Sequence, residues 1–190
     1  MTRETLLEQH LLAAVRPALG RRLISVEYLS WPGYFEPEAV NTADFWFGGE
    51  VRLTFAGDVL VFVSWGRKLS SLSESAFALI ARDESTFTKD AEMLPFDASR
   101  APQWSGLFGE TLDRAQVYGV GVEPHILELG FGTRSVLLAV GNEESGGQVG
   151  DCEDILIRSE GLPRMLEQLG GLCLSNGLAP GLLASLERAD

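Results

Sequence analysis

The stretch Leu53-Thr-Phe55-Ala-Gly-Asp-Val59-Leu-Val-Phe-Val63 decides the fold. Its first part continues an alternation of apolar and polar residues that begins at Val51, which is typical of a strand that buries one face. A short glycine-containing turn, Ala56-Gly57-Asp58, leads into a run that is apolar on both faces. Two such runs around a short turn predict a β-hairpin whose second strand is covered on both sides.

The same pattern returns in the second half as Leu129-Gly-Phe131-Gly-Thr-Arg-Ser135-Val-Leu-Leu-Ala139. Each copy follows a glycine with apolar residues three, six and eight positions later. These residues are Gly20, Leu23, Val26 and Tyr28 in the first half, and Gly109, Leu112, Ala115 and Val117 in the second. The matched spacing predicts a single domain of 190 residues built from two similar halves, at about residues 20–88 and 105–160.

The remaining segments complete an α+β prediction of two antiparallel β-meander units packed together. Residues 3–16 have apolar positions at helical spacing and predict an N-terminal helix that ends near Pro17. The C-terminus is predicted to be short and helical. Further strands are expected at 22–30, 76–88, 111–119 and 154–158, helical patches at 162–168 and 182–188, and an irregular connector at 89–107.

The net charge of −12 restricts the class of partner. Phosphate backbones and anionic membrane surfaces both need clustered Lys and Arg, so neither nucleic acid nor a membrane is expected to bind. The acidity is concentrated at residues 104–161, which contain ten carboxylates and three arginines and so have a net charge of −7. The plain interpretation is solubility, and the sharper one is a surface for a basic protein partner.

The candidate partner-binding residues are the carboxylates of one polar loop in this half. They are Glu143, Glu144, Asp151, Glu153 and Asp154. Oxygen-rich clusters bind Ca²⁺ or Mg²⁺ where six or more ligands converge, but the alternation of an EF-hand loop is missing here. A solvated loop, a protein-recognition loop and a cation site all remain open, and we predict no metal and no cofactor.

The sequence contains no motif that predicts catalysis. It has no G-x-S-x-G elbow, no P-loop and no complete dinucleotide fingerprint. His10, His125, Cys152 and Cys173 have no metal-ligand spacing, and the cysteines are expected to be free thiols. The N-terminus lacks the pattern of a signal peptide and no stretch reaches 18 apolar residues, so a cytoplasmic location is expected.

Four tryptophans define an alternative site. Aromatic side chains are favoured in binding pockets and at contact faces. A pocket between the two halves would be lined by Trp31, Trp46, Trp65 or Trp104 and would suit a small-molecule-binding protein or an enzyme. A homodimer through an apolar strand or helix face is a third interpretation.

Residues 50–158 resemble small bacterial domains of unknown function, some of them immunity proteins of polymorphic toxin systems. The resemblance rests on Val51–Gly66, on Asp97-Ala-Ser-Arg-Ala-Pro-Gln-Trp104 with Gly109, and on 127–157 with Gly150-Asp151. It implies a protein that binds another protein, and it transfers no catalytic residue. The leading prediction is therefore a non-enzymatic intracellular protein, of immunity type, that binds through an acidic surface.

Overall fold

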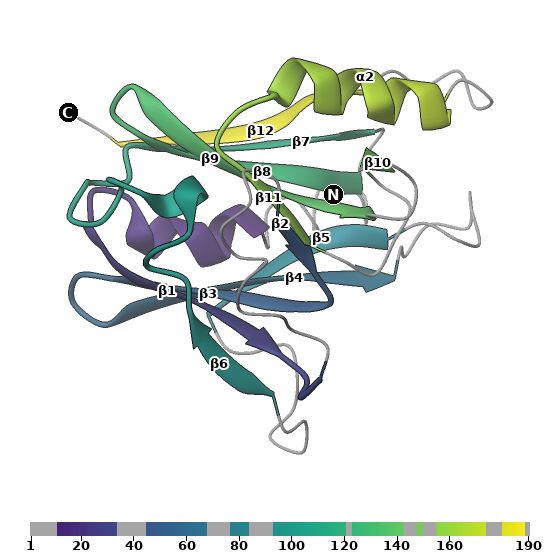
Figure 1. Ribbon diagram of the computed structural model, residues 1–190. Helices are drawn as coiled ribbons and strands as arrows, with labels where there is room; N and C mark the ends of the chain where they lie inside the picture. Colours follow the sequence, from purple (N-terminus) through teal and green to yellow (C-terminus); the bar gives the residue numbers. More distant parts are fainter. Residues whose placement is uncertain are drawn as a thin grey trace.

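The described part of the protein is mostly β, with two antiparallel sheets packed face to face, a helix on the outside of one sheet and a helical segment between the sheets (Figure 1). This architecture is seen in a computed structural model. The residues that it describes are 11–33, 45–67, 77–83, 93–120, 123–142, 148–149, 155–173 and 180–188.

The first sheet has five strands in the order β5-β4-β3-β1-β6. Neighbouring strands are all antiparallel, and the hairpin β3–β4 forms around the predicted turn at Ala56-Gly57-Asp58. The strands are β1 (Leu23–Ser30), β3 (Gly49–Phe55), β4 (Val59–Arg67), β5 (Phe77–Arg82) and β6 (Leu94–Asp97).

The second sheet has seven strands, six of them in the order β12-β7-β8-β9-β11-β2. The seventh, β10, pairs with β9 alone. The strand β2 belongs to the first half of the chain but pairs with β11 of the second half. The strands are β2 (Phe45–Phe47), β7 (Arg114–Val120), β8 (Glu123–Phe131), β9 (Arg134–Asn142), β10 (Gln148–Val149), β11 (Ile155–Arg158) and β12 (Pro180–Glu187).

The two halves have the same strand pairing, and two rows of paired residues across the sheets correspond one for one. In the first half Val26 lies opposite Leu53, which lies opposite Val61. In the second half the row is Ala115, Leu129 and Val136. The next rows also correspond: they are Tyr28, Val51, Val63 and Ala81 in the first half, and Val117, Leu127, Leu138 and Ile157 in the second. The two sheet units predicted from the repeated spacing are therefore similar in topology and in register.

A short antiparallel pairing joins the units where β1 and β7 begin, centred on an isolated bridge between Arg22 and Thr111. Each hydrogen bond here has a counterpart in the other unit. Gly20 N donates to Leu112 O, and Gly109 N donates to Leu23 O, both at 2.8 Å. Leu112 N donates to Arg21 O, and Leu23 N donates to Glu110 O, both at 2.9 Å. This reciprocal pattern is that of a two-fold axis passing through the Arg22–Thr111 bridge.

Each unit enters its first strand from a helical turn followed by a left-handed glycine. Residues 11–15 are helical and continue into the 3₁₀ turn η1 (Arg16–Ala18), which Gly20 ends at a φ of 75°. The second unit has the 3₁₀ turn η3 (Pro102–Trp104) and then Gly109 at a φ of 83°. Only glycine adopts such angles without strain, which explains why both copies of the pattern begin with glycine.

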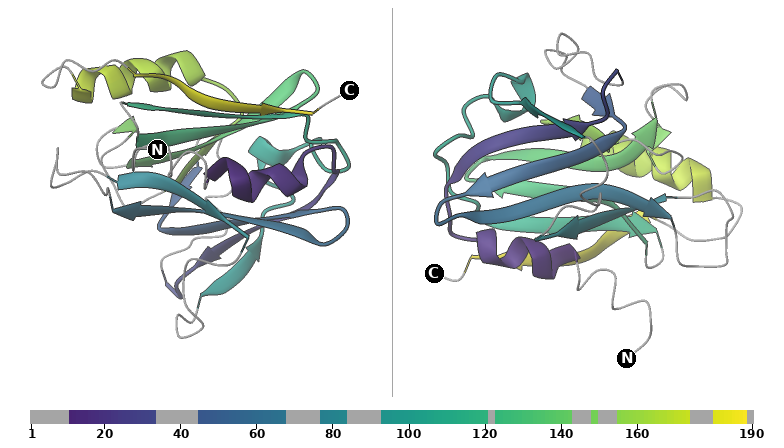
Figure 2. Two further views of the ribbon diagram at one scale, coloured as in Figure 1. Left: turned by 180° about the vertical axis from the view of Figure 1, so that it is seen from behind. Right: turned by 90° about the horizontal axis from the view of Figure 1, so that it is seen from below.

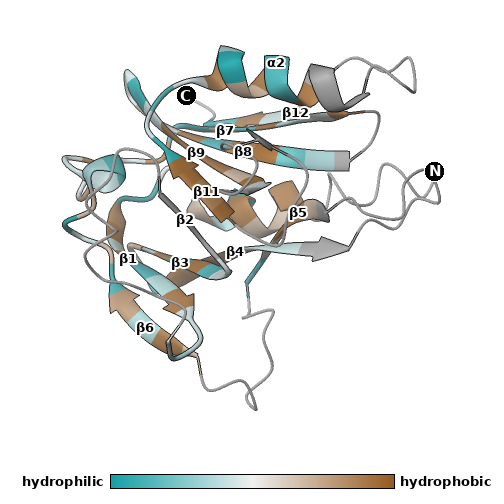
Figure 3. Ribbon diagram, turned by 45° about the vertical axis from the view of Figure 1, so that its right-hand side comes forward, coloured by the Kyte–Doolittle hydropathy of each residue, from teal (hydrophilic) through white to brown (hydrophobic). Residues whose placement is uncertain are grey.

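The main core fills the space between the sheets. It combines inward-facing residues of both units with Leu11, Leu12 and Val15 of the helical segment, which lies between the sheets at one side (Figure 2). Brown, hydrophobic residues recur along the strands of both sheets in Figure 3. A second cluster lies on the outer face of the seven-stranded sheet, where Met165 and Leu169 of α2 (Leu162–Cys173) cover Ile126, Leu137 and Leu156.

Three segments correct the sequence-based predictions. Residues 182–188 were expected to be helical, but residues 182–187 belong to strand β12, because pairing with β7 outweighs the helical spacing of the leucines. The expected connector 89–107 contains the short strand β6, whose Pro95 hid it. The predicted helix at 162–168 is present but runs to Cys173. The predicted α+β class is correct for the two similar sheet units but not for a wholly helical C-terminus, and residues 3–10 of the predicted N-terminal helix lie outside the described residues.

Candidate functional site

The predicted acidic residues Glu143, Glu144, Asp151, Glu153 and Asp154 lie outside the described residues. The structure does show where their segment is attached. It connects Asn142, the last residue of β9, to Ile155, the first residue of β11, and includes the short strand β10. The acidic segment therefore belongs to the connection between two neighbouring strands of the seven-stranded sheet.

The four tryptophans occupy separate places. Trp104 has no exposed surface, and its Nε1 donates a hydrogen bond of 2.7 Å to the Tyr28 hydroxyl, which is equally buried. Burial raises the pKa of Tyr28 well above its ordinary value, so this hydroxyl stays protonated. Trp65 is half-buried and packs against the main core, Trp31 follows β1, and the backbone of Trp46 lies on β2. Trp31, Trp65 and Trp104 are not among the described residues that line the hollow described below.

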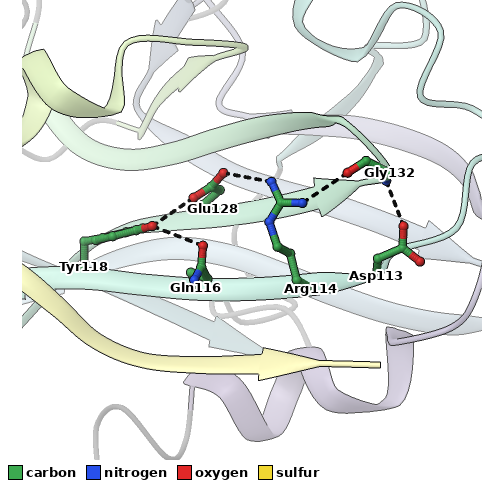
Figure 4. Close-up of polar contacts among 6 residues, drawn as sticks. All are labelled: Asp113, Arg114, Gln116, Tyr118, Glu128 and Gly132. Atoms are coloured by element: carbon green, nitrogen blue, oxygen red, sulfur yellow. Dashed lines mark hydrogen bonds and ion pairs between the residues drawn. The ribbon is translucent and has the colours of Figure 1, made fainter. Parts of the chain in front are cut away.

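A polar network crosses the outer face of the seven-stranded sheet (Figure 4). Arg114, Gln116 and Tyr118 alternate along β7, so their side chains share one face. Glu128 of β8 sits between them: its Oε1 is 3.4 Å from Arg114 Nη2, and its Oε2 accepts a 3.0 Å hydrogen bond from the Tyr118 hydroxyl. The Tyr118 hydroxyl also lies 3.2 Å from Gln116 Oε1. The charges of the arginine and the glutamate are thus satisfied within the sheet.

This network stabilises the pairing of β7 with β8 and does not form a reactive group. Burial, and then the charge of Glu128 and the hydrogen bond to it, raise the pKa of Tyr118 to about 12. A tyrosine with a raised pKa remains a hydrogen-bond donor and is a poor base or nucleophile. At the end of the network, Arg114 Nη1 donates to Gly132 O at 3.2 Å, and Gly132 N donates to Asp113 Oδ2 at 2.8 Å. These bonds hold the turn between β8 and β9.

An arginine in each unit ties the helical turn to a neighbouring turn or strand. In the first unit, Arg21 Nε donates to Pro17 O at 2.8 Å and its Nη1 donates to Ala56 O at 3.0 Å. In the second unit, Arg134 Nη1 donates to Ser105 O at 3.1 Å. Both guanidinium groups lie over a glycine: a Cβ at Gly57 would be 2.5 Å from Arg21 Nη1, and one at Gly106 would be 2.8 Å from both Arg134 Nη atoms.

A polar hollow of about 380 Å³ opens beside Arg134. Hydroxyl and amide groups of the η3 turn face those of the β8–β9 turn across it, together with the Arg134 guanidinium. A site lined by one cation and several hydroxyls, with no carboxylate among the described residues that line it, suits a small polar or anionic group. The lining residues are Pro102, Gln103, Ser105, Leu107, Thr133, Arg134, Ser135 and Ser159.

Neither the network nor the hollow could be identified from the sequence. The alternation of Arg114, Gln116 and Tyr118 was a usable signal for a polar outer face, but only the pairing of β7 with β8 brings Glu128 to it. The hollow depends on contact between two turns about 30 residues apart in the chain, which no local pattern encodes.

Among the residues that the structure describes, no group of three or more His, Cys, Asp or Glu side chains is placed to hold a metal ion. His125 lies on β8 and is buried. No helix within the described ranges has the length and apolar character needed to span a membrane.

Comparisons with known proteins give no relative. No family model, no curated protein and no solved structure matches this chain.

Proposed function

We propose that this protein acts by binding another protein, and that the partner presents basic groups. The observation that carries the proposal is the distribution of charge: −12 over the chain, of which −7 falls within residues 104–161. Much of this stretch builds the seven-stranded sheet, and the acidic connection between β9 and β11 joins two of its strands. A cationic surface would be attracted to this half of the molecule and oriented by it.

The polar side chains of the described sheet faces support binding rather than chemistry. Glu128 is paired with Arg114, and Glu27 is paired with Arg52 across β1 and β3. The pKa values of Tyr28 and Tyr118 are both raised, which favours the protonated form of each hydroxyl. We extend the proposal to an immunity-type role, in which the partner is a cationic toxin, from the strand and turn pattern of residues 50–158 alone, since no family model, curated protein or solved structure matches the chain.

The proposal is tested by capture followed by reconstitution. Proteins retained from cell extract at about 50 mM salt would be purified and mixed with this protein at defined ratios. A stoichiometric complex whose affinity falls at least about tenfold at about 500 mM salt is expected, because exposed charge pairs are screened. If no retained protein forms a stoichiometric complex, or if salt leaves the affinity unchanged, the proposal is wrong.

A small-molecule site is the second candidate, and the hollow beside Arg134 favours it. This hollow lies within the second unit, whereas the sequence analysis placed a pocket between the two halves. Calorimetric titration with inorganic phosphate and with acetate tests it, with Arg134→Gln as the comparison. Heat of binding that Arg134→Gln abolishes is expected. No heat from either anion at about 10 mM would count against a site for small anions.

A further inference from the structure

The two units differ in the length of one outer strand. In each unit a fifth strand returns to pair with the first: β6 pairs with β1, and β12 pairs with β7. Both strands lie at the edge of their sheet. However, β6 has four residues and β12 has eight. An edge strand presents unpaired backbone groups that a further strand can use, and proteins often protect such edges.

The outward-facing groups of β12 can be assigned from the ladder. Arg188 N donates to Asp113 O at 2.8 Å, in register with the pairs Leu186–Ala115 and Ala184–Val117. In an antiparallel ladder, residues alternate between bonding to the neighbouring strand and pointing away from it. The N–H and C=O groups of Ser185 and Glu187 therefore point away from β7, where the described part of the chain places no strand.

The same reasoning shows that β6 is protected. Ala98 N donates to Val26 O at 2.9 Å, so Pro95 and Asp97 of β6 point away from β1. Pro95 has no N–H to offer. Asp97 is a charged residue, and its carboxylate accepts hydrogen bonds from the backbone and hydroxyl of Ser99 at 2.8 and 2.9 Å.

At Ser185, the outward-facing position between Ala184 and Leu186, strand β12 has neither a proline nor a charged residue, although Glu187 follows and a bulge lies between Leu182 and Ala184. Ser185, opposite Gln116, corresponds to Asp97, opposite Glu27. Leu182 of β12 is 54% exposed and offers an apolar contact beside the edge. Of the two other edges among the described strands, β2 has three residues and β5 has six, so both are shorter than β12.

We propose that the outward edge of β12 accepts an extended cationic segment of the partner as an added strand. This inference rests on the proposed protein-binding function and specifies how that binding occurs. Backbone hydrogen bonds to Ser185 and Glu187 supply affinity, and alternate side chains of the added strand supply specificity. Charge decides the occupant: a second copy would bring together two chains of −12 each, whereas a cationic segment is attracted.

The experiment uses a fluorescent peptide of about ten residues that alternates lysine and valine, and measures its binding to the full chain by anisotropy. Two analogues carry N-methyl groups, one on every lysine and the other on every valine. Each keeps the charge and removes the backbone donors of one edge of the peptide. The protein variants are Ser185→Pro, which copies the device at Pro95, and Ser185→Ala as its matched control.

Strand addition predicts that Ser185→Ala binds like the natural chain and that Ser185→Pro binds at least about tenfold more weakly. It also predicts that at most one N-methylated analogue binds the natural chain, a result that does not depend on whether Ser185→Pro folds. Binding by both analogues, or undiminished binding by a folded Ser185→Pro, would show attraction by charge alone and overturn the inference. This outcome leaves the broader protein-binding proposal intact.

Two further outcomes would also overturn the inference. One is failure of the unmodified peptide to bind the natural chain at about 50 mM salt. The protein-binding proposal would then still be tested by the capture and reconstitution experiment described above. The other is a dimer, measured by light scattering, that Ser185→Pro dissolves, since this would assign the edge to a second copy of the chain.

Discussion

Replacing Tyr28 by Phe tests the buried contact that links the two units. Tyr28 lies on β1 of the first unit, and Trp104 lies on the η3 turn that precedes β7 of the second. Both side chains are fully buried, and a hydrogen bond of 2.7 Å joins them. Tyr28→Phe keeps the ring and removes the acceptor, which leaves the indole N–H of Trp104 buried without its partner. Such a group costs about 1–3 kcal/mol, so the free energy of unfolding should fall by that amount.

Urea denaturation followed by circular dichroism measures this change. The slope of the unfolding free energy against urea concentration should be the same for the variant and the natural chain, which shows that both expose the same surface on unfolding. Tyr118→Phe is the matched control. Its hydroxyl lies in a half-buried surface network, so a loss below about 1 kcal/mol is expected. In a Trp104→Phe background, Tyr28→Phe should cost at least about 0.5 kcal/mol less than in the natural chain. A Tyr28→Phe chain as stable as the natural one, with no such coupling, would refute the reasoning.

Four further predictions follow from the site and the turns. Gly20→Ala and Gly109→Ala should each lower the free energy of unfolding by about 1 kcal/mol, because both glycines have left-handed angles, and equal melting temperatures for variants and natural chain would contradict this. Burial raises the folded-state pKa of Tyr28 above its ordinary value of 10.0, so the contribution of the protonated hydroxyl to stability is fully present below pH 10.0 and is lost as the pH rises above it. The free energy of unfolding, measured with urea at alkaline pH, should therefore fall less for Tyr28→Phe than for the natural chain. Glu128→Gln should lower the pKa of Tyr118 from about 12, as measured by ultraviolet titration of the phenol, with Glu27→Gln leaving it unchanged. Gly106→Ala should displace the Arg134 guanidinium from Ser105 and change the backbone chemical shifts around both residues, and an unaltered spectrum would be inconsistent with that contact.

The sequence was most informative where a strand pairs with a neighbour in the chain. The hairpins β3–β4 and β8–β9 could be predicted because alternation and a glycine-containing turn are local signals. The repeated spacing from Gly20 and from Gly109 also predicted two similar sheet units. The spacing works because each glycine ends a helical turn and each apolar position faces the shared core.

Long-range pairing could not be predicted in the same way. Leu182, Leu183 and Leu186 have helical spacing, and Ala and Glu favour helices, yet pairing with β7 makes the segment a strand. The aromatic strand Phe45–Phe47 pairs with β11, which is over 100 residues away, and nothing in its sequence identifies that neighbour. In an edge strand as short as β6, a proline makes the residues look like a loop, because proline is rare in strands.

The candidate site was less predictable than the fold, because it depends on which faces meet. Charge counting gave the acidic second half, and that prediction still awaits a partner. The tryptophans were grouped by residue type, but Trp104 serves the core and Trp65 packs against it. The outward-facing groups of Ser185 and Glu187 became visible only once β12 was recognised as a strand.

The central claim is that two like units meet about a two-fold axis at Arg22 and Thr111, and nuclear magnetic resonance tests it most directly. Arg22 and Thr111 form a non-hydrogen-bonded antiparallel pair, because the hydrogen bonds join the residues on either side of them. The Cα atoms of such a pair are about 4.5 Å apart, so a strong cross-peak between the Hα protons of Arg22 and Thr111 is predicted. The amide protons of Gly20, Leu23, Gly109 and Leu112 should exchange slowly with solvent as one set, because all four donate hydrogen bonds there. No cross-peak, together with rapid exchange at these four amides, would contradict the account.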